Sequence, residues 1–452
     1  MSKSFTGLLF LFLISPYLLA QETVKTTPDS VLRFSLVQAQ DYALKNSFSH
    51  KNKIIDVEIA KMKVWETTAI GLPQISGNVK YQHFLDIPTS LLPAEIFGGP
   101  AGVYTPVKFG TSDNFNFGVT VTELIFSGEY IVGLQAAKTF KDLSIRSLEK
   151  SEKDTRESVA QAYYLALVLQ HNVSILDSSL RNTESIKKDM QAMFKAGFIE
   201  ETDFDQISLT VGNLRSTQGT LLRQAEMSLN LLKLQLGMEL EQIIVLTDDL
   251  ETIISNSNIE STSLQTFNIN SNSDYRLMET NEALTMLSLK RAKSKFLPTL
   301  AGFLSYSNGA QRNEFDFFKD GTPWFPTSLV GLQLDIPIFS SGMRYAQVKQ
   351  AKMALDQVKN TKEQVRVGLT IDFAKTKSDF ISANEKYYSE KENIALATKI
   401  YNKIVAKYKQ GLSSSMDLIQ AQNQMLNAQS NYFKAQVEML NAKAKLDKQI
   451  SK

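Results

Sequence analysis

Four short segments of the chain alternate apolar and polar residues with a period of two. In the first of them Ile75, Val79 and Tyr81 share one side, and Asn78 and Lys80 share the other. Such alternation predicts a β-strand with one apolar and one polar face. Each segment also has roughly the ten residues that a tilted strand needs to cross a bilayer. The segments are residues 73–84, 114–126, 298–307 and 328–339.

A half-buried strand in a soluble sheet would show the same alternation, and the third segment is the weakest because Phe303 falls on its polar side. The number of strands separates the two interpretations. Four strands cannot close a barrel, and an open sheet in lipid would expose unpaired N–H and C=O groups at its edges. Three copies of the chain supply twelve strands, which can close. The membrane interpretation therefore predicts a homotrimer around one β-barrel.

Between the strands, apolar residues recur at helical spacing over long stretches. No proline occurs between Val107 and Leu297 or after Pro337, and a proline inside a helix costs about 3 kcal/mol. Residues 128–194 and 342–408 can therefore form helices of roughly 100 Å. Shorter helices are expected over 34–70, 203–236, 274–297 and 416–450. The last has a three–four stripe typical of coiled-coil packing: Leu418, Ala421, Met425, Ala428, Tyr432, Ala435, Met439, Ala442 and Leu446.

The order of these elements is repeated along the chain. Leu72-Pro73 recurs as Leu297-Pro298, Ile125-Phe126-Ser127-Gly128 as Ile338-Phe339-Ser340-Ser341-Gly342, and Phe194-Lys195-Ala196-Gly197 as Tyr408-Lys409-Gln410-Gly411. The offset is 225 residues for the first pair and 213 to 214 for the later ones, so the first repeat has the longer loop between its strands. We expect a first structural repeat over 21–237, an equatorial connector over 238–273 and a second repeat over 274–450.

Residues 1–20 have the features of a signal peptide, because Lys3 precedes an apolar run over residues 7–19 and the small Ala20 follows it. Beyond residue 20 no apolar stretch approaches the about 20 residues of a transmembrane helix. A role in the membrane must therefore come from the strands.

Composition argues against several classes of function. The 49 basic and 47 acidic residues leave a net charge of +2, which does not suit nucleic acid as a partner. There is no cysteine and hence no disulfide or thiolate metal site. His50, His83 and His171 are not at metal-ligand spacing, and no phosphate-binding glycine loop or nucleophile elbow is present. We expect no catalytic residue, cofactor or metal, and hence no enzyme.

The duplicated order of helix, Leu-Pro, two strands, Phe-Ser-Gly, long helix, glycine turn and returning helix resembles the TolC-like outer-membrane efflux proteins. The resemblance covers nearly the whole chain after residue 20. It implies a homotrimer in the outer membrane of a Gram-negative bacterium, with a 12-stranded barrel and an α-helical tunnel projecting into the periplasm. It also implies passive export and partnership with a periplasmic adaptor (membrane fusion) protein, an inner-membrane pump and outer-membrane lipid.

The resemblance marks candidate residues at two hairpin tips. Gly197 and Gly411 match the turn glycines, and Asp203 and Asp417 each follow six residues later. In the family, carboxylates at the position of Asp417 narrow the periplasmic aperture, and a tyrosine at the position of Tyr408 hydrogen-bonds to the first tip near Asp203. The family's second ring carboxylate and its constriction-linked arginine fall here at Gln420 and Ser413, which favours a weaker gate than a salt-bridged lock.

Simpler roles fit the same residues. A glycine at a helix end supplies positive φ, and a carboxylate near a helix start stabilises it by about 1 kcal/mol. A periplasmic coiled-coil adaptor or structural interaction protein is the alternative for the whole chain, although adaptors usually have one hairpin and lack two pairs of amphipathic strands. Drug efflux, metal efflux and protein secretion, through a tripartite efflux or type I secretion system, fit the sequence equally well.

Overall fold

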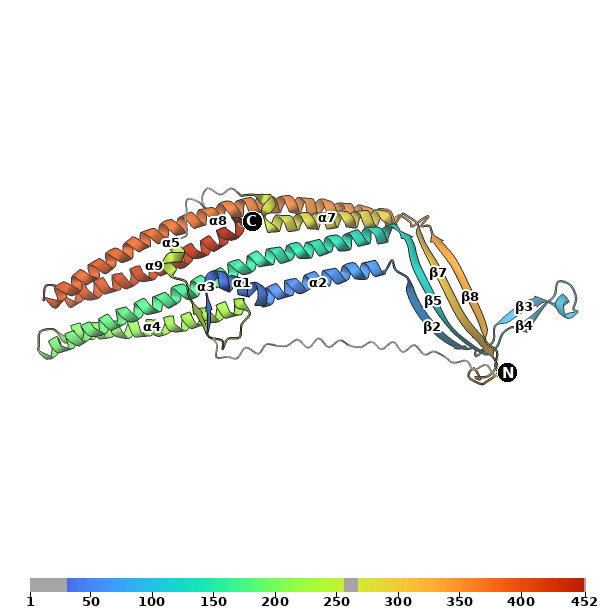
Figure 1. Ribbon diagram of the computed structural model, residues 1–452, viewed down its shortest axis with the longest axis horizontal. Coiled ribbons are helices and arrows are strands. Elements are labelled where there is room, and N and C mark those ends of the chain that lie inside the picture. The colour runs from blue at the N-terminus through green and yellow to red at the C-terminus, as the bar shows by residue number, and fades with distance from the viewer. Residues whose placement is uncertain (1–30, 256–266, 451–452) are drawn as a thin grey trace.

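The computed structural model describes residues 31–255 and 267–450. The expected signal peptide, 1–20, and part of the expected connector, 256–266, lie outside the described residues. The molecule is a long rod with two helical hairpins at one end and an antiparallel sheet at the other (Figure 1). It is therefore mainly α-helical, with one β part.

Two helices run from the sheet to the far end of the rod. α3 (Gly128–Lys195) has 68 residues and α8 (Met343–Lys409) has 67, which is roughly 100 Å each at 1.5 Å per residue. Ser127 caps the start of α3, because its hydroxyl accepts a hydrogen bond from the Tyr130 amide at 3.2 Å. No proline interrupts either helix. In the described part of the chain, none of the helices combines the length and the apolarity needed to pass through a bilayer.

Shorter helices complete the two hairpins. α4 (Glu201–Leu236) and α9 (Ser415–Ile450) return from the tips to the middle of the rod, and α2 (Phe48–Ala69) and α7 (Ser273–Ser294) cover the stretch from there to the sheet (Figure 1). Each half of the chain thus has one continuous helix beside a stack of two. α3 packs against α2 and α4, α8 packs against α7 and α9, and α3 also contacts α9.

The single helix expected over residues 34–70 is two helices in the structure. α1 (Leu36–Asn46) ends at Ser47, whose extended backbone breaks the helix and whose hydroxyl accepts from the His50 amide to begin α2. A close approach holds this break in place, because a Cβ on Gly237 at the end of α4 would lie 2.3 Å from the Asn46 carbonyl oxygen. Before α1, β1 (Leu32–Phe34) pairs in parallel with β6 (Ile244–Leu246).

The largest apolar core lies at the middle of the rod, where α1, α3, α8 and α9 meet the segment that joins the two halves. That segment contains β6, α5 (Leu250–Ser255) and a 3-10 turn, η2 (Ile269–Ser271). The buried Tyr163 hydroxyl donates to the Phe34 carbonyl at 3.0 Å, which ties β1 to α3. The core therefore holds the two halves of the chain together at the middle of the rod.

β2 (Gln74–His83), β5 (Asp113–Ser127), β7 (Thr299–Arg312) and β8 (Phe325–Asp335) form the antiparallel sheet in the order β2-β5-β7-β8. β8 begins three residues earlier than the expected 328 and ends four before the expected 339. Pro326 is tolerated inside it because β8 is an edge strand, where an N–H can be missing. Neither β2 nor β8 pairs with another strand of the described chain on its outer edge.

The sheet has two chemically different faces. Residues paired across antiparallel strands share a face, and the register joins Tyr81 to Phe115 and Val119 to Tyr306. We define the apolar face by Ile75, Val79, Tyr81, Phe115, Phe117, Val119, Val121, Leu304, Tyr306, Val330 and Leu332. We define the polar face by Gln74, Ser76, Asn78, Lys80, Gln82, Asn114, Asn116, Thr120, Thr122, Ser305, Ser307, Gln311, Thr327, Gln333 and Asp335.

Two loops extend from the sheet end that is remote from the helices. The longer one contains a separate hairpin of β3 (Thr89–Pro93) and β4 (Tyr104–Lys108), joined through the 3-10 turn η1 (Ala94–Phe97). The shorter one, 313–324, folds aromatic residues onto the apolar face. Phe317 there is 2 % exposed and its ring contacts those of Tyr81, Phe115 and Trp324.

Candidate functional site at the hairpin tips

Both hairpin tips use the same backbone turn. Gly197 and Gly411 have φ of +75° and +73°, a left-handed conformation that glycine adopts without strain. The Gly197 amide donates to the Phe194 carbonyl at 2.9 Å and the next amide donates to Met193 at 2.9 Å. Gly411 and Leu412 make the equivalent bonds, so both turns are Schellman motifs that end α3 and α8. The two glycines therefore act as helix terminators.

Asp417 is part of a capping box at the start of α9. Its Oδ2 accepts hydrogen bonds from the Ser414 amide at 3.0 Å and from the Ser414 and Ser413 hydroxyls at 2.8 and 3.1 Å. The Asp417 amide in turn donates to the Ser414 hydroxyl at 3.1 Å, which completes the box. The hydrogen bond from the Ser414 amide, followed by those from the two hydroxyls, lowers the pKa of the Asp417 carboxyl. The carboxylate is thus ionised and exposed at the tip.

Tyr408 is buried between the hairpins, 7 % exposed. Burial raises the pKa of its hydroxyl, and the carboxylates of Asp203 and Asp189 on the first hairpin add to the rise. Among the described residues this hydroxyl has no hydrogen-bond partner. The bond across to the first tip that the resemblance implies is therefore not formed within one chain. Asp203, in the first turn of α4, acts on Tyr408 through its charge.

An apolar cluster packs the two tips on each other, with members from α3, α4, α8 and α9: Ile186, Met190, Ile207, Ala397, Tyr401, Tyr408, Leu418, Ala421 and Met425. A buried polar contact, which the sequence analysis missed, joins the same helices. The Gln422 amide of α9 donates to the Thr183 hydroxyl of α3 at 2.6 Å. The sequence signal was the recurrence of glutamine at Gln422, Gln429 and Gln436, every seventh residue beside the apolar stripe.

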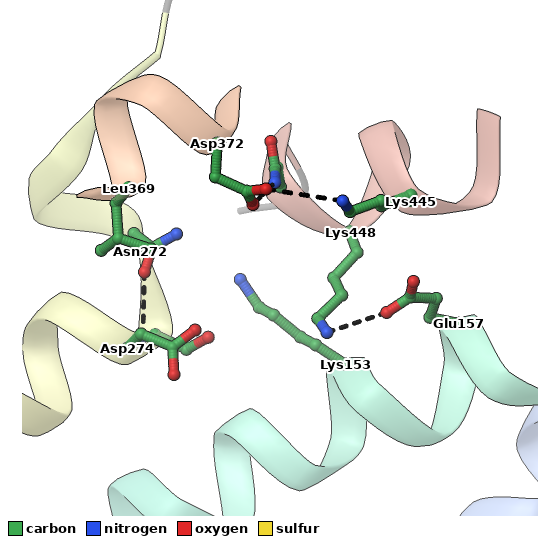
Figure 2. A pocket seen from close by; sticks show the side chains of 10 residues that line it. Lys153, Glu157, Asn272, Asp274, Leu369, Asp372, Lys445 and Lys448 are labelled. Atoms are coloured by element: carbon green, nitrogen blue, oxygen red, sulfur yellow. Dashed lines mark hydrogen bonds and ion pairs between the residues drawn. The ribbon is translucent and has the colours of Figure 1, made fainter. Parts of the chain in front are cut away.

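A second group of charged residues lines a cavity of about 100 Å³ at the middle of the rod, where the start of α7 meets the end of α9 (Figure 2). Lys448 lies 2.6 Å from Asp154 and 2.8 Å from Glu157 of α3. Lys445 lies 3.4 Å from Asp372 of α8. Burial lowers the pKa of Lys448, but its two carboxylate partners outweigh burial and the net pKa is raised. These ion pairs hold α9 against α3 and α8.

A metal centre in this chain would need clustered histidines and carboxylates. Within residues 31–255 and 267–450, no cluster of three or more of them could hold a metal ion. The chemistry of the tips is therefore that of helix caps, an ionised carboxylate and a buried hydroxyl.

Comparison with known proteins gives a family match over part of the chain and a fold for nearly all of it. The sequence model of the outer membrane efflux protein family matches residues 278–450, which include β7, β8, α8, α9 and most of α7. A comparison with curated protein sequences found no match. Solved structures of similar fold are known.

Three of these structures cover 92 % of this chain. A membrane protein from Pseudomonas aeruginosa aligns with a TM-score of 0.72 and 15 % identity over 92 % of its own length. The Campylobacter jejuni CmeC outer membrane channel aligns with a TM-score of 0.69 and 18 % identity over 85 % of its own length. The open state of the Neisseria gonorrhoeae MtrE outer membrane channel aligns with a TM-score of 0.67 and 17 % identity over 88 % of its own length. The chain therefore has the fold of outer membrane channels.

Proposed function

We propose that this chain, whose residues 278–450 belong to the outer membrane efflux protein family, is the outer-membrane exit duct of a tripartite efflux or type I secretion system. It conducts substrates passively from the periplasm to the exterior. The family is one of transport ducts and not of enzymes. The observation that carries the proposal is a sheet with one apolar and one polar face at the end of a helical rod of roughly 100 Å.

The sheet needs further copies of itself to enter lipid. Its outer strands β2 and β8 leave their outer edges unpaired, and unpaired backbone groups are costly in hydrocarbon. Pairing β8 of one copy with β2 of the next would satisfy both edges. Three copies would give twelve strands, with the apolar face toward lipid and the polar face toward the lumen. The α-helical hairpins would continue the lumen as a tunnel.

The oligomeric state tests this arrangement directly. We expect the purified chain to need detergent and to have the mass of a trimer by light scattering. A monomer that stays dissolved without detergent would contradict the proposal. Cell fractionation distinguishes the duct from the alternative function. A periplasmic adaptor would be recovered in the soluble periplasm, whereas a duct would be recovered in the outer membrane.

The hairpin tips are the proposed contact with a periplasmic adaptor protein, which connects the duct to an inner-membrane pump. Phe198 and Leu412 occupy equivalent positions just beyond the turn glycines and are 80 % and 71 % exposed. Exposed apolar side chains at both tips suit a protein contact. Replacing both with serine should reduce export while leaving trimer mass and bilayer conductance unchanged. Unchanged export would contradict the contact.

Asp417 is the proposed aperture residue. Tyr408, packed between the hairpins, and Asp203, at the equivalent position of the first tip, are the other candidate residues of the aperture. Three exposed, ionised Asp417 carboxylates at one end of a trimer would attract cations. We expect Asp417→Ala to weaken the cation preference of the channel in planar bilayers, with Asp203→Ala as the comparison. Unchanged conductance and unchanged cation preference would leave Asp417 with the role of a helix cap.

A further inference from the structure

The polar face of the sheet is almost free of charge. Most of its side chains are amides and hydroxyls or are small, and the register adds the apolar Leu124, Phe303, Phe325 and Leu329. On this face of the four strands, all of which lie in the described part of the chain, Lys80 and Asp335 are the ionisable residues. His83, Asp113, Glu123 and Arg312 fall on the apolar side of the register. A lumen lined by this face would therefore have two charges per chain.

The two charges lie at opposite ends of the sheet. Asp335 is the last residue of β8 and pairs with Thr299, next to the helices. Lys80 lies near the other end of the sheet, where the cross-strand pairings place it level with Phe325 on β8. The pairings run from Lys80 to Asn116, from Asn116 to Gly309 and from Gly309 to Phe325. Phe325 is ten residues from Asp335 along β8. That separation is roughly 33 Å at 3.3 Å per residue.

Lys80 has no counter-charge near it. Its cross-strand partner is Asn116, and its neighbours on the same face of β2 are Asn78 and Gln82. Among the described residues no carboxylate lies within ion-pair distance of it, and its strand is exposed along its whole length. Asp335 likewise makes no ion pair within the described part of the chain, and it accepts from the Gln333 amide at 3.2 and 3.1 Å. The two charges therefore act on whatever passes along the polar face.

We propose that Lys80 and Asp335 set the charge selectivity of the barrel part of the duct, separately from Asp417 at the tip, with Lys80 the residue that favours anionic solutes at the exit. This inference rests on the proposed trimeric barrel. Three lysines would form a positive ring near the outer mouth, and three aspartates a negative ring at the junction with the helical tunnel. The electrostatic energy of an anion would fall as it moves outward from the negative ring to the positive ring. The class of solute favoured on leaving the barrel is thus an organic or inorganic anion.

Salt concentration decides whether this effect is visible. The Debye length is about 10 Å at 0.1 M ionic strength and about 30 Å at 0.01 M. In a wide lumen a ring of three charges reaches the axis only in dilute salt. The experiment is therefore the reversal potential of reconstituted channels under a potassium chloride gradient at about 0.01 M. The charge preference should weaken as the salt is raised.

Three variants reverse or remove the charges. We expect Lys80→Gln to move the reversal potential toward the cation equilibrium potential, and Lys80→Glu to move it further in the same direction. Asp335→Asn should move it the opposite way. Lys108→Gln, in the separate β3–β4 hairpin, is the matched control and should leave it unchanged.

The chain has no cysteine, which permits a second test by chemical modification. Val79 and Lys80 are neighbours on β2 that face opposite sides. In Lys80→Cys, a cationic methanethiosulfonate reagent should restore the wild-type reversal potential. An anionic reagent should instead shift the reversal potential toward the cation equilibrium potential. In Val79→Cys both reagents should leave the current unchanged, because that side chain would face lipid.

The outcomes separate the two proposals. One outcome is that the wild-type protein conducts and yet has the same reversal potential in dilute salt as Lys80→Gln and Lys80→Glu. That result would overturn the role of Lys80 but not the proposed duct. Absence of any conductance from wild-type trimers would overturn the duct itself and the inference with it.

Discussion

At the scale of single residues, equivalent positions of the two tips have different surroundings. Asp203 and Asp417 each lie six residues after a turn glycine, yet only Asp417 follows two serines that donate to its carboxylate. The residues at the matching positions before Asp203 are Ile199 and Glu200. The sequence could predict both turn glycines, because positive φ at a helix end selects glycine. The capping box also has a sequence signature, because Ser414 precedes Asp417 by three residues, but treating the two tips as equivalent left it unpredicted.

Gly411→Ala tests the left-handed turn. A Cβ there would meet no atom within 4 Å, so the cost comes from its φ of +73°. We expect the free energy of unfolding to fall by about 1–2 kcal/mol in thermal melts followed by circular dichroism. Gly368→Ala, inside the same helix α8 and equally uncrowded, is the control. It should raise stability by about 0.5–1 kcal/mol, and equal effects at the two positions would contradict the assignment.

Asp417 should make the second tip sensitive to acid. Its pKa is lower in the folded chain than in the unfolded chain, so its contribution is complete above the unfolded value of about 4. The contribution is lost as the pH falls through the folded value. Melting temperatures between about pH 5 and pH 3 should therefore fall less in Asp417→Asn than in wild type. Parallel curves for the two proteins would show that the capping box does not form.

At the scale of the elements, the distribution of proline and the stripe on residues 416–450 predicted the long helices, because both are local properties of the chain. The break between α1 and α2 was not predicted. It lies where Gly237 approaches Asn46, two residues that are far apart in sequence. The irregular polar side of the third strand also has a tertiary explanation, because the Phe303 ring covers Gly331 on β8, where a Cβ would come within 2.6 Å of it.

The contact between Thr183 and Gln422 is a fully buried polar link between the two hairpins near their tips. Both side chains are fully buried, with 0 % exposure, and Thr183→Val would leave the Gln422 amide without an acceptor. An unpaired buried amide costs about 1–3 kcal/mol, and the melting temperature should fall accordingly. The double variant Thr183→Val with Gln422→Leu should lose less than the sum of the single losses. Strict additivity would mean that the two side chains do not interact.

At the scale of the whole molecule, one chain exposes apolar surface that the proposed trimer would cover. α2 exposes four large apolar side chains: Ile55, Ile59, Met62 and Trp65. Groups of this size are unusual on a monomer, and in the proposed trimer a neighbouring copy would cover them. The two faces of the sheet lead to the same expectation, because closing a barrel takes more strands than one chain has.

Ile59→Glu tests this covering. Ile59 is 60 % exposed in the single chain, so the monomer should tolerate a carboxylate, whereas burial in an interface would leave the charge unpaired. We expect the fraction of trimer in detergent, measured by light scattering, to fall. Lys61→Glu, on the same helix and already at a charged, exposed position, should keep the trimer. A full yield of trimer from Ile59→Glu would place the interface elsewhere.

The two outer strands of the sheet have a further consequence for assembly. In the proposed barrel, β8 of one copy pairs with β2 of the next, so two joined copies would still present one open β2 and one open β8. A pair would therefore not be an end state, and each further copy would either close a ring or lengthen an open ribbon. The twist between neighbouring strands would then determine how many copies make a closed ring.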